Sequence, residues 1–284
     1  MTTKLHGAIA AAVTPLTEGG RQLDEAAVEP LVRFLADGGV DGILVCGTTG
    51  EGVLLRLEER MRLTELFVRA RPATGFRIAV HAGAQTTDDT VALAAHAQEH
   101  GADAVAVIAP PYFPLDSEEL YRHLRAAANA CDPLPFYVYE FAGRSGYAIP
   151  VPVIERLRED VPNLTGLKVS DMPFDAVRPY LLEGIDVFVG QEPFALQGMD
   201  AGAVGAVSGL ATAFPSLVAR LVHERDPGAH ERVVALRAGL AGIPFHAAMK
   251  QILIEEGVLL RADVRAPLRG LTDEERVRVL ALRA

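Results

Sequence analysis

The chain has 284 residues, of which 50% are hydrophobic and 23% charged, so it can bury a large core and is neither disordered nor fibrous. Its formal net charge of −10 disfavours nucleic acids and anionic membranes as partners. Two cysteines, Cys46 and Cys131, are too few for a disulfide framework. We therefore expect a cytoplasmic protein without a secretory signal.

Eight short apolar segments alternate with longer amphipathic segments along the first 228 residues. The apolar segments predict strands over 7–13, 42–45, 77–81, 104–108, 136–139, 164–169, 186–189 and 205–208. The amphipathic segments predict helices over 24–37, 57–71, 87–100, 117–130, 152–159, 174–183, 193–201 and 215–223. Continuous apolar strands are typical of a parallel sheet buried on both faces. Eight consecutive βα units favour a closed (β/α)8 TIM barrel over an open, doubly wound sheet.

The chain changes character after the eighth unit. Residues 229–284 predict helices only, one opened by Gly242-Ile-Pro244 and the last by a capping box that begins at Thr272. We therefore divide the chain into a barrel domain, 1–228, and a C-terminal helical extension, 229–284, which packs on the barrel without a separate activity. The uncharged stretch 201–219 is interrupted by glycines and by Pro215, so we do not expect it to span a membrane.

The ends of the predicted strands carry the chemistry in a TIM barrel, because catalytic residues gather at the carboxyl ends of the strands. Lys168 ends the sixth strand between Leu167 and Val169, and it is one of only three lysines in the chain. A lysine that points into the barrel is desolvated, which favours the free amine, a nucleophile toward carbonyl groups. The alternative is a lysine that reaches solvent or pairs with an acidic neighbour such as Asp171.

Two other strand ends, with the loops that follow them, carry polar residues that suit a small anionic substrate. Thr48 and Thr49, in Gly-Thr-Thr-Gly after the second strand, offer hydroxyls and backbone N–H groups to a carboxylate. Tyr139 ends the fifth strand, where a phenol can move protons on and off a carbonyl, although a core aromatic is the alternative. Arg144, in the loop beyond, is either a solvated cation or a clamp for a second carboxylate or a polyhydroxy chain.

Metal and phosphate sites are less well supported. His81, Glu140, Asp171 and Glu192 also lie near strand ends, but their spacing matches no metal motif, so we expect no metal. The glycine-rich segment 202–209 is similar to a phosphate-binding segment. No basic residue occurs between Asp200 and Arg220, which argues against a phosphate ligand there.

These residues, taken together and in order, resemble the dihydrodipicolinate synthase and N-acetylneuraminate lyase family. The resemblance is carried by Thr14-Pro15, Gly-Thr-Thr-Gly-Glu at 47–51, Pro-Pro-Tyr at 110–112, Tyr139 with its following Arg-Ser-Gly turn, and Gly-Leu-Lys at 166–168. It extends over nearly the whole chain and implies a TIM barrel that assembles as a homotetramer, a dimer of dimers. It also implies a class I aldolase that works through a covalent imine, without a metal or another cofactor.

The resemblance implies a role for each matching residue. Lys168 forms a Schiff base with the keto carbon of pyruvate, and Tyr139 transfers protons. Thr48 and Thr49 hold the pyruvate carboxylate, and Thr48 also relays a proton between tyrosines. A second tyrosine, which in this family crosses the tight dimer interface, is Tyr112, or else its place is taken by Phe113. The remaining substrate-binding residues that we predict lie at or just beyond strand ends and are Arg144, Glu140, Gly190 and Leu210.

Three departures from the family pattern bear on which aldehyde is the second substrate. Glu140 stands where dihydrodipicolinate synthases have Asn, the Tyr112 loop is one residue short, and the loop after the seventh strand reads Gly190-Gln-Glu. Glu140 in the pocket would repel a carboxylate-bearing aldehyde, whereas Arg144 would attract one, so we expect a hydroxyaldehyde to be preferred over aspartate semialdehyde.

We therefore predict a pyruvate-dependent lyase or aldolase acting on a 2-keto acid of the 2-keto-3-deoxy sugar acid type. 4-Hydroxy-tetrahydrodipicolinate synthase is the first alternative. A 2-keto acid binding protein without turnover is the second, and a metal-dependent barrel lyase is the third.

Overall fold

A closed parallel barrel forms the centre of the molecule, and the predicted (β/α)8 fold is confirmed. The computed structural model describes residues 4–72 and 75–283. The barrel strands are β1 (Gly7–Ala11), β4 (Gly42–Val45), β5 (Arg77–His81), β6 (Ala104–Ile108), β7 (Phe136–Glu140), β8 (Leu164–Val169), β9 (Asp186–Val189) and β10 (Gly205–Ser208). Because β1 pairs with both β4 and β10, the sheet has no edge, which excludes the doubly wound alternative.

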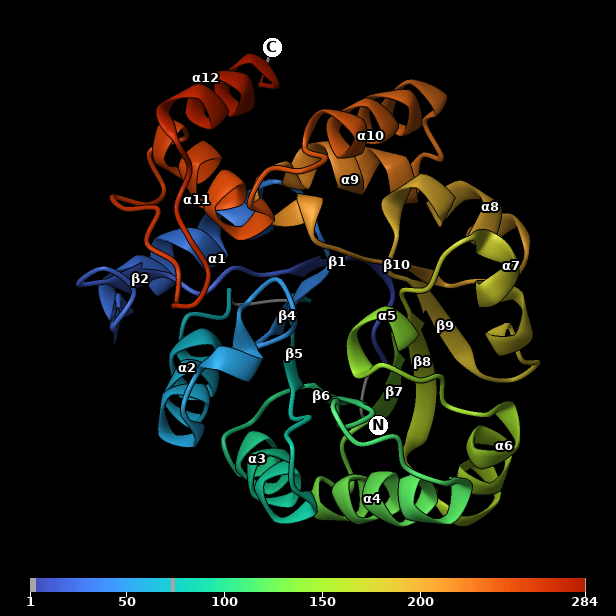
Figure 1. The fold of residues 1–284 in the computed structure, drawn as a ribbon. Coiled ribbons are helices and arrows are strands. Elements are labelled where there is room, and N and C mark those ends of the chain that lie inside the picture. Colours follow the sequence, from blue (N-terminus) through green and yellow to red (C-terminus); the bar gives the residue numbers. More distant parts are fainter. Residues whose placement is uncertain (1–3, 73–74, 284) are drawn as a thin grey trace.

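The helices form a ring around the strands, which Figure 1 views roughly along the barrel axis. They are α1 (Val28–Asp37), α2 (Leu57–Arg69), α3 (Thr87–Glu99), α4 (Ser117–Ala130), α6 (Val151–Asp160), α7 (Phe174–Val177), α8 (Ala195–Asp200) and α9 (Pro215–His223). Each long helix buries one apolar stripe against the sheet, as its spacing predicted; in α1 the stripe is Val28, Leu31, Val32 and Leu35.

Strand alternation divides the core into an interior and an outer layer. Residues that point into the barrel include Ile9, Ala79, Ala106, Tyr137 and Phe188, which pack on one another. Their strand neighbours point outward and pack against the helices. Side chains fill the lower barrel, so a ligand has room only at the carboxyl ends of the strands.

The C-terminal segment is helical, as expected. It forms α10 (Pro227–Gly239), α11 (Phe245–Glu255) and α12 (Asp273–Ala281), which lie on one side of the barrel in Figure 1. The predicted capping box begins α12, where Thr272 Oγ1 accepts from Glu275 N at 3.2 Å and Glu275 Oε2 accepts from Thr272 N at 2.9 Å. The boundary between 228 and 229 falls in the first turn of α10, so it remains a prediction.

Some local structure differs from the prediction. A short hairpin, β2 (Leu16–Thr17) and β3 (Gln22–Leu23), and the one-turn helix α5 (Ala142–Ser145) were not predicted. The helix expected over 174–183 stops at Val177 and continues as a 3-10 turn, Arg178–Tyr180, because Pro179 cannot donate to the helical ladder. No helix in the described residues has both the length and the apolar character needed to cross a bilayer.

Candidate active site

Lys168 points into the upper end of the barrel. Its strand neighbours Leu167 and Val169 pack against the outer helices, so the two-residue period of β8 turns Lys168 inward. Only 6% of Lys168 is exposed. The register pairs Lys168 with Tyr139 on β7, and Lys168 Nζ lies 3.9 Å from the centroid of the Tyr139 ring. The amine is thus held in a largely desolvated position beside an aromatic face.

Tyr139 connects this amine to the loop that follows β4. Its hydroxyl lies 3.1 Å from Thr48 Oγ1, close enough for a hydrogen bond in either direction. On its other side the edge of the His81 ring contacts Tyr139, with ring centroids 5.8 Å apart. Burial, then the charges of Arg60 and Lys168, lowers the pKa of His81 to about 3, so this imidazole is neutral. Tyr139 is 1% exposed and contacts both the Thr48 hydroxyl and the His81 ring.

The loop 46–52 has the compact geometry that an anion cradle needs. Cys46 and Glu51, at its two ends, both have left-handed backbone angles, with φ of 58° and 57°. Thr14 Oγ1 donates to Gly50 O at 2.6 Å and secures the turn. Among the described residues, none accepts a hydrogen bond from the backbone N–H of Thr48 or Thr49. These two donors remain available for a carboxylate.

A cavity of about 300 Å³ opens above these residues. Its inner wall comes from the strand ends, and its outer wall comes from α5, α10 and α11. The lining residues are Ala11, Thr48, Thr49, Tyr139, Phe141, Arg144, Lys168, Ser170, Gly190, Gln191, Val207, Gly209, Arg237, Leu240, Ala241, Phe245 and His246.

Gly190 leaves the space that this cavity needs. A Cβ atom at Gly190 would lie 1.9 Å from Ser170 Oγ, so only glycine fits beside Ser170 without displacing it. Gln191 Nε2 donates to Ser170 O at 2.9 Å, which leaves the Gln191 amide oxygen as an acceptor at the cavity.

The structure therefore brings six of the predicted residues together: Lys168, Tyr139, Thr48, Thr49, Arg144 and Gly190. Leu210 does not line the cavity. It is fully buried, and its N–H donates to Glu192 Oε1 at 3.0 Å. Its neighbour Gly209 lines the cavity instead.

Glu140 is also placed away from the cavity, in contrast to our expectation of a substrate contact. Tyr139 faces inward, so the strand period turns Glu140 outward beneath α5, where it is 0% exposed. Its Oε2 accepts from Ile149 N at 2.8 Å. Burial, with a contribution from nearby Asp171, raises the pKa of Glu140 to about 8. The repulsion that we expected between Glu140 and an acidic aldehyde has no structural basis.

Tyr112 and Phe113 lie outside the cavity of their own chain. They are 82% and 71% exposed and meet edge to face, with centroids 4.8 Å apart. Tyr112 has a φ of 89°, which is costly for a residue with a side chain. Neither residue lines the cavity that Tyr139 lines.

Two contributors to the site were missed because they come from the C-terminal helices. Arg237 on α10 lines the cavity and pairs with Glu192 through Nε and Nη2, each at 2.8 Å from a carboxylate oxygen. Burial raises the pKa of Glu192, but Arg237, the Leu210 N–H and Ser208 outweigh it and hold the pKa below its usual value. His246 on α11 contacts Thr48 O through Nε2 at 3.0 Å. In the sequence, Arg237 lies in the predicted C-terminal helical extension, and nothing in the pattern around it indicated a role in catalysis.

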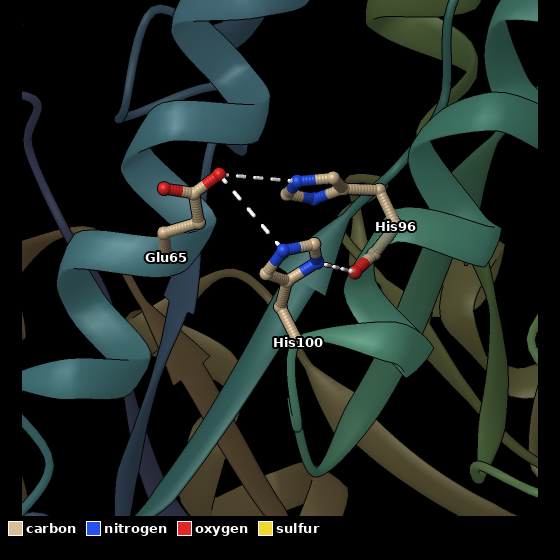
Figure 2. Close-up of side chains that lie close together, drawn as sticks. All are labelled: Glu65, His96 and His100. Carbon is tan, nitrogen blue, oxygen red and sulfur yellow. Dashed lines mark hydrogen bonds and ion pairs between the residues drawn. The ribbon is translucent and has the colours of Figure 1, made fainter.

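Potential metal ligands do not gather at the cavity. Within residues 4–72 and 75–283, one group of three His, Cys, Asp or Glu residues has ligand atoms that all lie within 4.8 Å of one another, and it consists of Glu65, His96 and His100. Figure 2 shows this group on the helical layer, between α2 and α3. None of the three lines the cavity.

Comparisons with known proteins match nearly the whole chain. A profile of the dihydrodipicolinate synthetase family matches residues 4–282. An uncharacterized DapA-like lyase of Halobacterium salinarum is 33% identical over 287 residues, covering 96% of this chain and 91% of that protein.

Two solved structures superpose over nearly the whole chain. Dihydrodipicolinate synthase from Aquifex aeolicus has a TM-score of 0.90 at 28% identity, covering 98% of this chain and 97% of that one. Proteus mirabilis N-acetylneuraminate lyase also has a TM-score of 0.90, at 29% identity, covering 99% of this chain and 98% of that one.

Proposed function

This chain belongs to the dihydrodipicolinate synthetase family of lyases, and from that premise we propose that Lys168 forms the Schiff base with pyruvate. The enzyme is a class I aldolase that makes or cleaves a carbon–carbon bond between pyruvate and an aldehyde. The observation that carries the assignment to Lys168 is its contact with Tyr139, which in turn reaches Thr48 Oγ1 at 3.1 Å.

Pyruvate binds with its carboxylate on the loop after β4. The N–H groups and hydroxyls of Thr48 and Thr49 supply donors for the two carboxylate oxygens. This places the keto carbon over Lys168, whose unprotonated amine attacks it. The carbinolamine then loses water to give the imine, and Tyr139 supplies the proton that the leaving hydroxyl needs.

Carbon–carbon bond formation follows from the imine. The Tyr139 phenolate left by the dehydration takes a proton from the methyl carbon to give an enamine, whose electron pair attacks the aldehyde carbon. The developing alkoxide takes that proton from Tyr139. Water then adds to the imine and gives a proton back to Tyr139, and collapse of the carbinolamine restores the Lys168 amine. Thr48 hydrogen-bonds to Tyr139 and relays protons between it and the second tyrosine. The protonated imine accepts the electrons throughout, so we propose that no metal or other cofactor takes part in the reaction.

We propose a neutral hydroxyaldehyde as the second substrate, which makes the product a 2-keto-3-deoxy sugar acid. Ser170, Gln191 and His246 line the cavity and offer donors and acceptors for hydroxyls. The Arg237 guanidinium is already neutralised by Glu192.

Arg144 supports a second candidate. Its guanidinium lines the cavity and lies 5.6 Å from the Phe141 ring, without a carboxylate partner among the described residues. A free guanidinium is suited to a distal carboxylate, as aspartate semialdehyde carries. The Aquifex aeolicus relative is named a dihydrodipicolinate synthase, which fits this alternative.

The exposed aromatic pair supports an assembly in which subunits meet at the loop after β6. Tyr112 and Phe113 are more than two-thirds exposed, and Tyr147 fixes the loop by donating to Pro110 O at 2.9 Å. We propose that this loop packs against another subunit of a homotetramer, and that Tyr112 rather than Phe113 reaches the neighbouring relay.

The central test is chemical trapping. Pyruvate with borohydride should add one reduced adduct per chain, and peptide mapping should find it on Lys168. The other two lysines serve as internal controls: Lys4 is exposed and pairs with Asp186, and Lys250 is buried in an ion pair. An adduct on either of them, or none at all, would reject the assignment.

A further inference from the structure

Two histidines and one glutamate converge between α2 and α3, outside the barrel. Glu65 lies on α2, His96 on α3, and His100 caps the end of α3. In Figure 2 both imidazoles approach the same carboxylate oxygen. Glu65 Oε1 is 3.4 Å from His96 Nε2 and 4.0 Å from His100 Nε2. The spacing of four residues places both rings on one face of the helix.

The hydrogen bond made by His100 fixes where its proton lies. Its Nδ1 is 2.9 Å from His96 O, and a carbonyl oxygen can only accept, so Nδ1 carries the hydrogen. The other ring nitrogen of His100, Nε2, faces Glu65 Oε1 at 4.0 Å. A cation that binds both of these atoms would stabilise the arrangement.

The two imidazole rings are stacked, with centroids 3.9 Å apart and an interplanar angle of 21°. A metal lies in the plane of each imidazole that binds it, so the His100 ring must turn out of the stack for both Nε2 atoms to reach the same ion.

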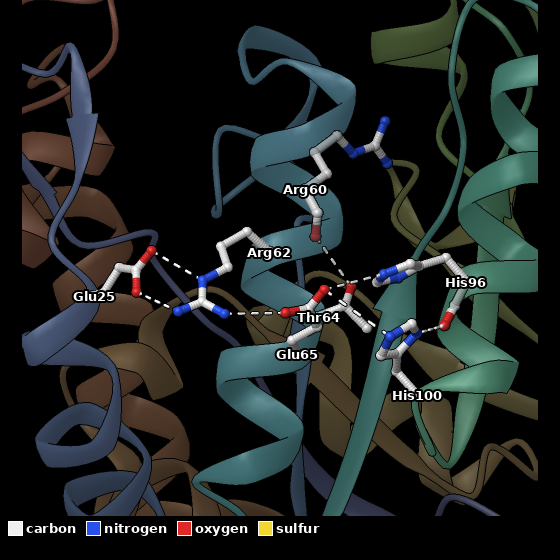
Figure 3. A network of polar contacts seen from close by, with 7 residues as sticks. All are labelled: Glu25, Arg60, Arg62, Thr64, Glu65, His96 and His100. Atoms are coloured by element: carbon white, nitrogen blue, oxygen red, sulfur yellow. Dashed lines mark hydrogen bonds and ion pairs between the residues drawn. The ribbon is translucent and has the colours of Figure 1, made fainter.

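The carboxylate is oriented by a second layer of charges, shown in Figure 3. Arg62 Nη1 donates to Glu65 Oε2 at 3.0 Å, while Arg62 Nε and Nη2 donate to Glu25 at 2.9 and 2.6 Å. This pairing holds one oxygen of Glu65 and leaves Oε1 directed at the histidines. Metal-binding carboxylates are commonly held in this manner.

We propose that Glu65, His96 and His100 form a binding site for a divalent metal of the zinc class, which links α2 to α3. Ligand atoms in a tetrahedral zinc site are about 3.4 Å apart, given metal–ligand bonds near 2.0–2.1 Å. The Glu65–His96 distance already has this value, and turning the His100 ring out of the stack would bring in the third ligand. Water fills the fourth position. Two nitrogens and one oxygen select zinc, cobalt or nickel over magnesium.

The simpler alternative is an ion pair between Glu65 and His96 that stabilises the helix packing without a metal. It explains the 3.4 Å contact. It does not require the second imidazole, whose Nε2 lies 4.0 Å from the same oxygen. Only a metal makes His100 indispensable, and the two interpretations therefore differ in the effect of changing that residue.

The test is metal titration of full-length protein that has first been stripped with EDTA. Zn²⁺ followed by calorimetry should bind once per chain, and Co²⁺ should develop the visible absorption of a tetrahedral site. His100→Asn keeps a donor for His96 O but removes the ligating nitrogen, and it should weaken Zn²⁺ binding by at least about tenfold. Glu65→Gln should do the same. Mg²⁺ should not bind at this site.

His223→Asn is the matched control, because His223 is a surface histidine that also contacts a carboxylate, with Nε2 2.6 Å from Asp41 Oδ2. This variant should bind Zn²⁺ at Glu65, His96 and His100 as the wild type does. Zn²⁺ should also raise the Tm of wild type and of His223→Asn, but not that of His100→Asn. Equal Zn²⁺ affinity in wild type and His100→Asn, or no saturable binding in wild type, would overturn the proposal. Borohydride trapping at Lys168 should be the same in all variants, which keeps this result separate from the proposed catalytic role.

Discussion

Lys250 Nζ lies 2.6 Å from Glu51 Oε1, and neither side chain is accessible to solvent. Glu51 ends the loop that carries Thr48 and Thr49, and Lys250 belongs to α11, so this ion pair joins the anion cradle to the C-terminal helices. Lys250 also donates to Asp263 O at 2.6 Å, and Glu51 Oε2 accepts from Arg265 N at 2.6 Å. The pair compensates for the left-handed backbone at Glu51, which costs on the order of 1 kcal/mol or more.

We predict that Lys250→Met destabilises the enzyme by about 3–5 kcal/mol, because it leaves the Glu51 carboxylate buried without a counter-charge. Urea unfolding measures the loss. Adding Glu51→Gln to Lys250→Met should recover part of it, since the buried charge is then gone. Arg225→Met, which breaks the exposed Arg225–Asp200 pair, is the control and should have little effect. A cost for Lys250→Met as small as that of the control would contradict the prediction.

Tyr139→Phe should keep the fold and lower kcat by roughly 10² to 10⁴, because it removes the hydroxyl that moves the proton. Tyr137→Phe is a matched control on the same strand. Tyr137 points into the lower barrel, where its hydroxyl accepts from Leu5 N at 3.2 Å, away from the cavity. Its loss should lower stability by about 1 kcal/mol and leave kcat nearly unchanged. Steady-state kinetics of both variants distinguish a catalytic phenol from a packing aromatic.

Glu140 should make stability fall as pH rises. Its pKa is raised to about 8 by burial and by Asp171, so between pH 4.5 and 8 the folded state holds a proton that the unfolded state releases. Stability from this group is complete below pH 4.5 and is lost as pH approaches and passes 8, with a slope of at most about 1.4 kcal/mol per pH unit. Glu140→Gln is neutral at every pH and should flatten the curve in that window. Urea midpoints measured from pH 5 to pH 9 check this, and parallel curves for the two proteins would refute it.

The barrel and its inner site could be predicted from the sequence, because both depend on the short repeat of apolar residues in helices and on the alternation of side chains along strands. The apolar pattern gave the strands, and closure brings all carboxyl ends together, so Lys168, Tyr139 and Thr48 were expected to meet. The same two-residue period, applied from Tyr139, would have turned Glu140 outward. Arg237 was beyond prediction, because its place depends on an ion pair with Glu192 across 45 residues and on how α10 packs over the barrel.

Arg144 should decide between the two candidate aldehydes. If its guanidinium binds a distal carboxylate, Arg144→Gln should lower kcat/KM for aspartate semialdehyde by about tenfold or more, since a hydrogen bond to a charged group contributes about 1.5–3 kcal/mol. The same variant should change kcat/KM for glyceraldehyde much less, because a glutamine amide still donates to a hydroxyl.

Borohydride trapping of Arg144→Gln with pyruvate should be unaffected. Glu140→Gln is the control for a change next to Tyr139: the Glu140 side chain is buried and does not line the cavity, so the substitution should leave the ratio of the two kcat/KM values unchanged. We expect wild type to prefer the hydroxyaldehyde. A wild-type preference for aspartate semialdehyde that is lost in Arg144→Gln would instead establish the synthase activity and assign its carboxylate contact to Arg144.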